Sequence, residues 1–269
     1  MQGTPPGLSP YCGAPPAPDQ LLVRWNLDPL LIGVLLAILG LYAAGLRRAP
    51  GGDGGAARRR AFLAGWLVAA LALVSPLCPL SVSLFSARVG QHMVLTLIAA
   101  PLLAYGRPLE AIAAALRRRA PSPDRPRPIA ASIAFMALLW LWHAPGPYDA
   151  TFVGPVVYWE MHVTMIGAAF WLWHELINRP ASLGAAAAGA ISMIQMGLLG
   201  ALITLAPRAL YAPHALTTWA WGLTPLQDQQ LGGAIMWVPG GIVFLVAAGV
   251  LSLKALRPRL APDLRPARA

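Results

Sequence analysis

The chain alternates long apolar stretches with short polar connections. Seven stretches are long enough to cross the hydrocarbon core of a bilayer, which takes about 20 residues of helix. None shows the period-two alternation of a barrel strand, and a backbone in lipid must satisfy its polar groups within its own segment. The sequence therefore predicts an all-α fold class, a polytopic membrane bundle of seven transmembrane helices. The helices are expected at about residues 28–46, 61–79, 87–106, 129–146, 154–177, 183–206 and 230–253.

The basic residues predict the orientation of these helices. Of the 20 Lys and Arg residues, seventeen fall in the connections after the first, third, fifth and seventh stretches. Only Arg24, Arg88 and Arg208 fall on the opposite side. Because basic connections stay in the cytoplasm, the N-terminus is expected outside and the C-terminus inside.

Composition supports a multi-pass protein of the cell (inner) membrane. Apolar residues make up 57% of the chain and charged residues only 11%, so most of the surface does not face water. The net charge of +10 follows from topology, and no nucleic-acid partner is expected. Residues 1–27 are expected to form an external disordered tail, residues 28–253 the membrane domain, and residues 254–269 a basic cytoplasmic tail.

Ionisable and sulfur-containing residues gather at one depth, in the outer part of several predicted helices. Ionisable groups in membrane helices are costly and mark functional sites. Imidazole suits copper, zinc and iron, and thioether favours Cu(I), so this layer predicts a metal site, with copper as the hypothesis. The candidate ligands are His92, His143, His162, Met93, Met236 and Asp228, with Gln91, Tyr158 and Glu160 as candidate supporting residues. Glu160 points about 200° away from His162 around their helix, so these two are not expected to bind the same ion.

Each of these residues also has a structural interpretation. His143 could lie at the headgroup boundary, and His92 and His162 could form hydrogen bonds between helices. The methionines are typical packing residues. Asp228 could cap the start of the seventh helix. Within that same helix, Gly232 and Gly233 would let a neighbouring helix approach closely.

Three residues outside the predicted helices receive structural expectations. His214 is expected to be solvated in an external connection. Cys12 and Cys78 both fall outside, where thiols can oxidise. A disulfide or a copper-capturing thiolate is open to them, but unpaired thiols are expected.

Several motifs together resemble the CtaG-type assembly factors of cytochrome c oxidase, the multi-span family of the caa3-type oxidase. The resemblance covers about residues 28–253, and this family is distinct from the single-span copper chaperone that shares its name. The most distinctive segment is Pro225–Gly233, which in the family usually has Glu where this chain has Gln227. The other motifs are Gln91-His92-Met93 with Pro101, Trp142-His143-Ala144-Pro145 with Tyr148-Asp149, and Glu160-Met161-His162.

The resemblance implies a membrane factor that helps to mature a haem–copper oxidase in respiratory chain biogenesis, plausibly by supplying copper. It implies oxidase subunits as partners, beside the lipid bilayer, and no enzymatic activity. Three other functions stay open: a haem b-binding electron carrier, a transporter of metal ions or small solutes, and a scaffold that binds no metal. The oxidase subunit served, the metal's oxidation state and the oligomeric state are not predicted.

Overall fold

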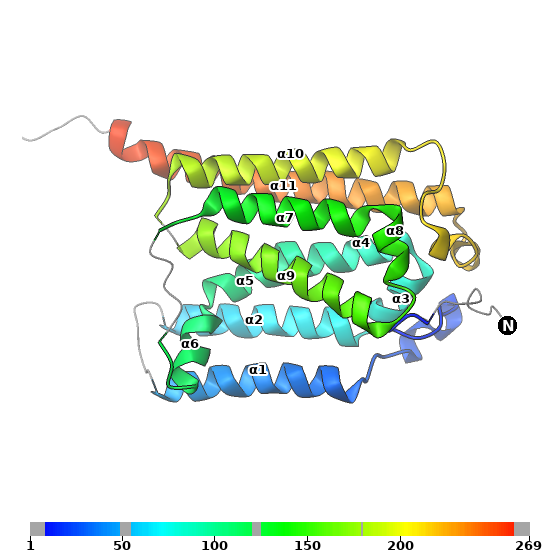
Figure 1. The fold of residues 1–269 in the computed structure, drawn as a ribbon, viewed down its shortest axis with the longest axis horizontal. Coiled ribbons are helices and arrows are strands. Elements are labelled where there is room, and N and C mark those ends of the chain that lie inside the picture. The colour runs from blue at the N-terminus through cyan, green and yellow to red at the C-terminus, as the bar shows by residue number, and fades with distance from the viewer. Residues whose placement is uncertain (1–8, 49–54, 120–124, 179, 261–269) are drawn as a thin grey trace, which may run out of the picture.

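The computed structural model describes residues 9–48, 55–119, 125–178 and 180–260, and within these ranges the regular structure is helical throughout. Figure 1 shows long helices lying side by side along one axis. The α-helices are α1 (Pro29–Arg48), α2 (Gly55–Val74), α3 (Leu77–Ser83), α4 (Phe85–Met93), α5 (Ala100–Tyr105), α6 (Pro108–Ala115), α7 (Pro128–His143), α8 (Pro145–Ala150), α9 (Pro155–Asn178), α10 (Leu183–Leu205) and α11 (Pro225–Leu260). A π-helical turn, η2 (Val94–Ala99), joins α4 to α5, and short 3₁₀ turns form η1 (Pro18–Val23), η3 (Ala212–His214) and η4 (Thr218–Trp221).

All seven predicted stretches are helical. The second is bent, because α2 and α3 meet at an angle of 47° beside Pro76. The third is α4, η2 and α5 in succession, and the seventh continues as helix through residue 260. The helix therefore takes up the first part of the expected basic tail, whose residues 261–269 lie outside the described ranges.

Four helices in the described ranges are long and apolar enough to cross a membrane: α1, the run Phe85–Tyr105, α10 and α11. The bent pair α2–α3 counts as a fifth if it is one span. The helix α7, with 16 residues, is apolar but shorter. The molecule is thus a membrane-type helical protein, with four to five spans supported by length and composition.

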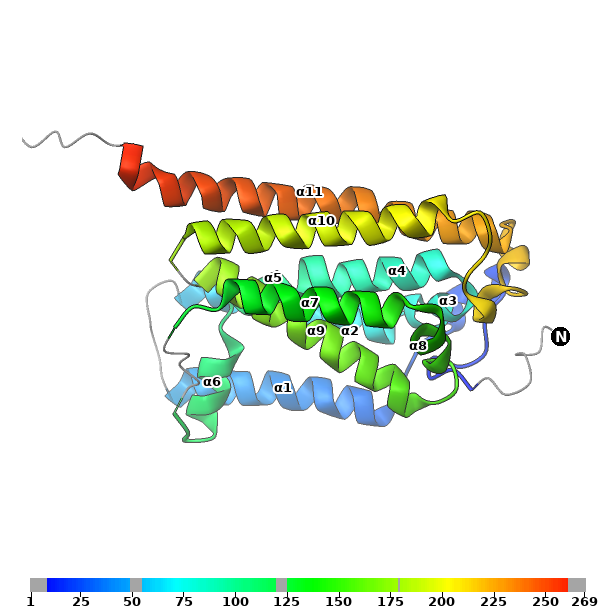
Figure 2. The ribbon, with the colours of Figure 1, turned by 45° about the horizontal axis from the view of Figure 1, so that its top comes forward.

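The two ends of the bundle differ in chemistry. One end carries residues 9–27, α3, α8 and the connection 206–224, and we call it the disulfide end. The other carries α6 and the C-terminal ends of α1 and α11 (Figures 1 and 2). Most of the arginines in the described ranges fall in or beside the helix ends there. This segregation of charge follows the pattern from which the orientation was predicted.

Residues 9–27 are ordered in the structure, and the prediction of a disordered tail was wrong for them. We call this segment the N-terminal strap. The amide of Ser9 donates to the carbonyl of Phe152, and the hydroxyl of Ser83 donates to the carbonyl of Pro16 at 3.0 Å. A disulfide joins Cys12 to Cys78 of α3, with their Cα atoms 5.5 Å apart. Pro and Gly content indicated a lack of core-forming residues, but covalent and polar attachments fix the strap instead.

Small residues set how closely helices pack, as predicted for Gly232 and Gly233. A Cβ on Gly233 would lie 2.7 Å from the carbonyl oxygen of Gly200 in α10. A Cβ on Gly232 would meet the ring of Phe85 in α4 at 2.5 Å. Only glycine permits both approaches, so α11 is held directly against α4 and α10. This contact fixes the N-terminal end of α4. His92, the first histidine of the predicted site, lies on the same helix.

Candidate functional site

The three predicted histidines converge in the structure. His92 comes from α4, His143 from the end of α7 and His162 from α9. The ring centroid of His92 lies 5.4 Å from that of His162 and 6.1 Å from that of His143, both in edge-to-face arrangements. All three side chains are buried inside the bundle.

Backbone carbonyls orient two of these rings. Nδ1 of His143 lies 2.8 Å from the carbonyl oxygen of Leu139, and Nδ1 of His162 lies 3.0 Å from that of Tyr158. Because a carbonyl oxygen only accepts, each Nδ1 carries the proton and each Nε2 presents a lone pair. Both Nε2 atoms are buried without a hydrogen-bond partner. His92 has no hydrogen-bond partner at either ring nitrogen.

Unpartnered buried nitrogens need an explanation, because an unsatisfied buried polar group costs about 1–3 kcal/mol. The sequence left open that these rings form hydrogen bonds between helices. The structure shows no such bond to their Nε2 atoms. These unpartnered nitrogens instead lie close together in the core. No three His, Cys, Asp or Glu side chains in the described part of the chain are arranged so that they could hold a metal ion as they stand. Binding an ion would therefore require the rings to turn out of edge-to-face contact.

The local backbone around His92 departs from a regular α-helix. Within the π-helical turn the amide of Ala100 donates to Leu95 instead of Thr96. The freed carbonyl of Thr96 accepts the indole N–H of Trp173 at 2.8 Å, and the hydroxyl of Thr96 donates to the carbonyl of His92. Pro101, which has no N–H to donate, follows directly. Such turns recur at functional sites because they re-aim the side chains around them.

Arg88 lies one turn from His92 on the same face of α4, and the sequence analysis missed it. It had been counted as an external positive charge, but the structure buries it completely, at 1% exposure. Its Nη2 donates to the hydroxyl of Thr151 at 2.6 Å, and its guanidinium lies 4.4 Å from the ring centroid of Phe152. Its Nε has no partner. The spacing Arg88-x-x-x-His92 could have revealed it, since residues four apart share a helix face.

The two predicted methionine ligands lie in the central core. Met93 is 6% exposed and Met236 is fully buried, and both belong to the same apolar cluster as Tyr158 and Met161. Their burial is what the packing interpretation expects. Whether either sulfur binds an ion stays a prediction.

Asp228 is a helix cap, but for a different helix from the one predicted. Its carboxylate accepts hydrogen bonds from the amides of Phe85 and Ser86, at 2.6 and 3.1 Å, and from the hydroxyl of Ser86. It therefore caps α4 from α11. The start of α11 is capped by Thr224 and Gln227, each of whose side chains binds the other's amide. Gln performs this role as well as Glu does.

The candidate supporting residues divide between two roles. Tyr158 holds His162 through its carbonyl, and its ring centroid lies 4.2 Å from the His162 ring. Gln91 turns the other way, since its Nε2 donates to the carbonyl of Ala72 in α2. Glu160 is exposed on the surface of α9, away from His162, as the angle between them predicted.

The connection 206–224 covers the site at the disulfide end. The hydroxyl of Tyr211 donates to the carbonyl of His143 at 2.9 Å, and Thr217 donates to the carbonyl of Ser83. His214 is buried and forms a 2.7 Å hydrogen bond with the hydroxyl of Tyr148, so the prediction of a solvated His214 was wrong. Burial lowers the pKa of His214 to about 3.

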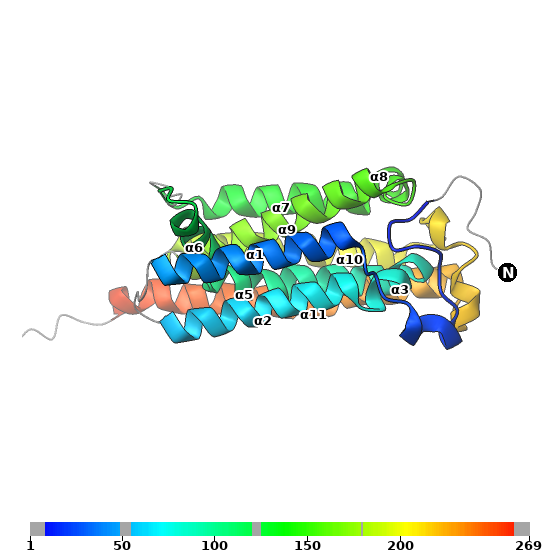
Figure 3. The same cartoon turned by 90° about the horizontal axis from the view of Figure 1, so that it is seen from below.

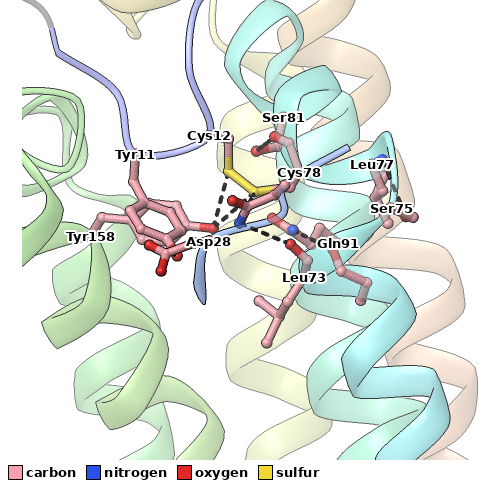
Figure 4. Close-up of a disulfide and its surroundings, with 12 residues drawn as sticks. Tyr11, Cys12, Asp28, Leu73, Ser75, Leu77, Cys78, Ser81, Gln91 and Tyr158 are labelled. Carbon is pink, nitrogen blue, oxygen red and sulfur yellow. Dashed lines mark hydrogen bonds between the residues drawn. A yellow bond between two sulfur atoms is a disulfide. The ribbon is translucent and has the colours of Figure 1, made fainter. Parts of the chain in front are cut away.

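The disulfide is linked to His162 through Tyr158, whose ring lies against the His162 ring. Figure 4 shows the hydroxyl of Tyr158 beside the two sulfur atoms, at 3.4 Å from Cys12 and 3.7 Å from Cys78. The expectation of unpaired thiols was wrong, because the fold of the strap brings the two residues together across 66 positions of sequence. Spacing alone could not reveal this pairing.

A comparison with protein families places this geometry in context. The model of the cytochrome c oxidase caa3 assembly factors matches residues 40–258, most of the chain. The chain belongs to this family. No curated protein and no solved structure gives a significant match. The match includes all three histidines, Arg88 and Asp228, whereas Cys12 lies outside it. Membership in the family assigns the chain to oxidase assembly. The step that it performs there has to be inferred from the geometry of the site.

Proposed function

We propose that this caa3 assembly factor carries copper at the three-histidine cluster and delivers it to the oxidase, as a non-enzymatic membrane protein. Copper is its cargo, so the site must both accept and release the ion. The observation that supports the proposal is the convergence of His92, His143 and His162 with their Nε2 atoms unpartnered. Neutral imidazole with a free lone pair is a good copper ligand.

Two features favour exchangeable binding over a permanent structural site. The rings are not preset around an ion, so coordination needs a rearrangement that can be reversed. Carbonyl bonds at Nδ1 hold two rings in the tautomer that can bind metal. A cargo site with these properties can pass its ion on by ligand exchange.

The buried charge of Arg88 favours a monovalent ion. A guanidinium one turn from His92 repels any nearby cation, and it repels a dication twice as strongly as a monovalent one. The core around it holds Met161, whose sulfur lies 3.8 Å from the guanidinium. We therefore propose Cu(I) rather than Cu(II) or Zn(II) as the cargo.

The site is proposed to face the extracytoplasmic side, in a seven-span protein with its N-terminus outside. The charge segregation supports this orientation. The helix α6 and the C-terminal end of α11 lie at the opposite end of the bundle from α3 and α8 (Figure 3), and most of the arginines in the described ranges fall in or beside the helix ends there. A disulfide at this end is also compatible with an oxidising compartment. Oxidase subunits that await copper on that side are the proposed partners.

The alternative functions fit the site less well. A haem between two of the histidines would need a gap for the porphyrin, whereas the rings are in edge-to-face contact. A transporter would need polar groups lining a path to the other end. There, one carboxylate oxygen of Glu175 accepts from the amide of Arg127. Asn178 bonds the carbonyl of Ala104 and the side chains of Arg107 and His174, so both residues are held by neighbouring protein groups. A metal-free scaffold would leave the unpartnered nitrogens unexplained.

Complementation tests the proposal. Cells that lack this chain should recover active caa3-type oxidase with the wild-type protein but not with a His92→Ala, His143→Ala, His162→Ala triple variant, and the oxidase purified from the variant strain should be deficient in copper. Glu160→Gln, which changes an exposed residue of α9, is the matched control and should complement. Copper-replete oxidase in the triple-variant strain would contradict the proposal and support the scaffold.

A further inference from the structure

The disulfide has surroundings that are typical of a reactive cysteine pair. Cys78 is fully buried, whereas Cys12 is only partly buried, beside the exposed residues Gly13 and Ala14. Nδ2 of Asn26 donates to the Cys78 sulfur at 3.4 Å. The hydroxyl of Tyr158 lies within hydrogen-bonding distance of both sulfurs.

Hydrogen-bond donors next to sulfur stabilise the thiolate, which is the form that binds metal and exchanges disulfides. A purely structural disulfide needs no such donors. Here a partly buried amide and a buried phenol both reach the Cys78 sulfur, and Asn26 is itself fixed by donating to the carbonyl of Leu73 at 3.2 Å. The pair therefore has one sulfur on a partly exposed residue, Cys12, and one, on Cys78, whose thiolate is supported from two sides.

Only one aromatic ring separates this pair from the histidine cluster. Tyr158 reaches the sulfurs with its hydroxyl and contacts the His162 ring with its own ring, at a centroid distance of 4.2 Å. The strap packs over the same place, since the rings of Tyr11 and Tyr158 are stacked at 4.8 Å. Tyr158 therefore contacts both the sulfur pair and the histidine cluster.

We infer that Cys12 and Cys78 form a second, redox-controlled copper site at the entrance to the histidine cluster. As a disulfide the pair binds no metal; as a dithiol it provides two soft sulfur ligands, which select Cu(I). The inference deepens the proposed function and rests on it for the identity of the cargo.

Opening the site takes two electrons, which we assign to an extracytoplasmic protein dithiol. One thiolate of that reductant attacks the accessible Cys12 sulfur; the Cys12–Cys78 bond breaks, and Cys78 leaves as a thiolate beside Asn26 and Tyr158. The second thiolate of the reductant then attacks the other reductant sulfur, which is bonded to Cys12 in the mixed disulfide. Cys12 leaves as a thiolate. The reductant is oxidised to a disulfide, and Cu(I) takes the place of the thiol protons on the two cysteines.

The test measures Cu(I) binding to the full-length detergent-purified protein, anaerobically, by competition with a bicinchoninate–Cu(I) complex. We compare protein with its disulfide intact and protein reduced by a phosphine that is then removed. Reduction should raise the stoichiometry by one Cu(I) per chain and introduce copper–sulfur scattering in the X-ray absorption spectrum. The increment should disappear in Cys12→Ser and after alkylation of both thiols in the wild-type chain, which needs no variant to fold.

The His92→Ala, His143→Ala, His162→Ala triple variant separates this inference from the proposed function. If the histidines bind no copper, the triple variant will match wild type in the oxidised state, yet it will still gain one Cu(I) on reduction. No gain on reduction in the wild-type chain, or a gain that survives in Cys12→Ser, would overturn the inference and make the disulfide a structural crosslink. Tyr158→Phe should slow reduction of the disulfide by about fivefold, the effect of losing one hydrogen bond to the leaving thiolate.

Discussion

Replacing Asp228 tests whether this residue is a helix cap rather than a copper ligand. The N-cap residue of α4, Leu84, provides no side-chain hydrogen bond, so the carboxylate of Asp228 satisfies the amides of Phe85 and Ser86 from 143 and 142 residues away. The negative charge also lies at the positive end of the helix dipole.

The magnitude follows from the bonds lost. A hydrogen bond to a charged acceptor contributes about 1.5–3 kcal/mol, and a helix cap about 1 kcal/mol. Asp228→Ala leaves two buried amides unsatisfied, so we expect a loss of about 3 kcal/mol. For a chain of this size that corresponds to a fall in melting temperature of about 6–12 °C. Asp228→Asn keeps one acceptor oxygen and should lose about half as much.

The assay is thermal unfolding of the purified protein in detergent, followed by loss of the monodisperse peak in size-exclusion chromatography. Glu110→Gln is the matched control, since Glu110 is exposed and its pairing with Arg107 at 3.4 Å contributes little. Copper stoichiometry, measured well below the melting temperature, should be unchanged in Asp228→Asn. If that variant keeps wild-type stability but loses copper, the cap assignment is refuted.

Three further predictions test the packing and electrostatics. Gly233→Ala should destabilise the protein by about 1–3 kcal/mol, because its Cβ would meet the Gly200 carbonyl, whereas Gly241→Ala, with open space around it, should be neutral in the same melting assay. The pKa of His214 is lowered by burial to about 3, so the unfolded chain binds more protons and stability should fall as the pH drops below about 6.5; His214→Gln should flatten this dependence, and an unchanged slope would refute the assignment. Arg88→Gln should raise the affinity for Zn(II) relative to Cu(I) in metal competition, and an unchanged ratio would mean that the buried charge does not select the ion.

Much of the fold could be predicted from the sequence because lipid imposes a simple rule on spans. Apolar length located seven stretches that are all helical, and the Gly232–Gly233 pair identified a close helix contact in advance. What the pattern could not provide was long-range pairing. The Cys12–Cys78 bond and the capping of α4 by Asp228 join residues far apart in sequence, through contacts that exist only once the bundle has formed.

The candidate site was predicted in part for the same reason. Depth along each helix placed His92, His143 and His162 in one layer, but rotation about the helix axis decided that they face one another. Burial was predicted poorly in the connections between helices. We expected His214 to be solvated because it lies outside the apolar stretches, yet the fold of residues 206–224 buries it. Burial in a connection depends on what the loop packs against, which composition does not record.

The most direct measurement of the central claim is Cu(I) binding by the detergent-purified chain with its disulfide intact, for wild type and for His92→Ala, His143→Ala and His162→Ala separately. Wild type should bind one Cu(I) per chain with imidazole scattering in its X-ray absorption spectrum, and each substitution should reduce the affinity at least tenfold. A wild-type chain that binds no copper, or three variants that bind it as tightly as wild type, would contradict the account.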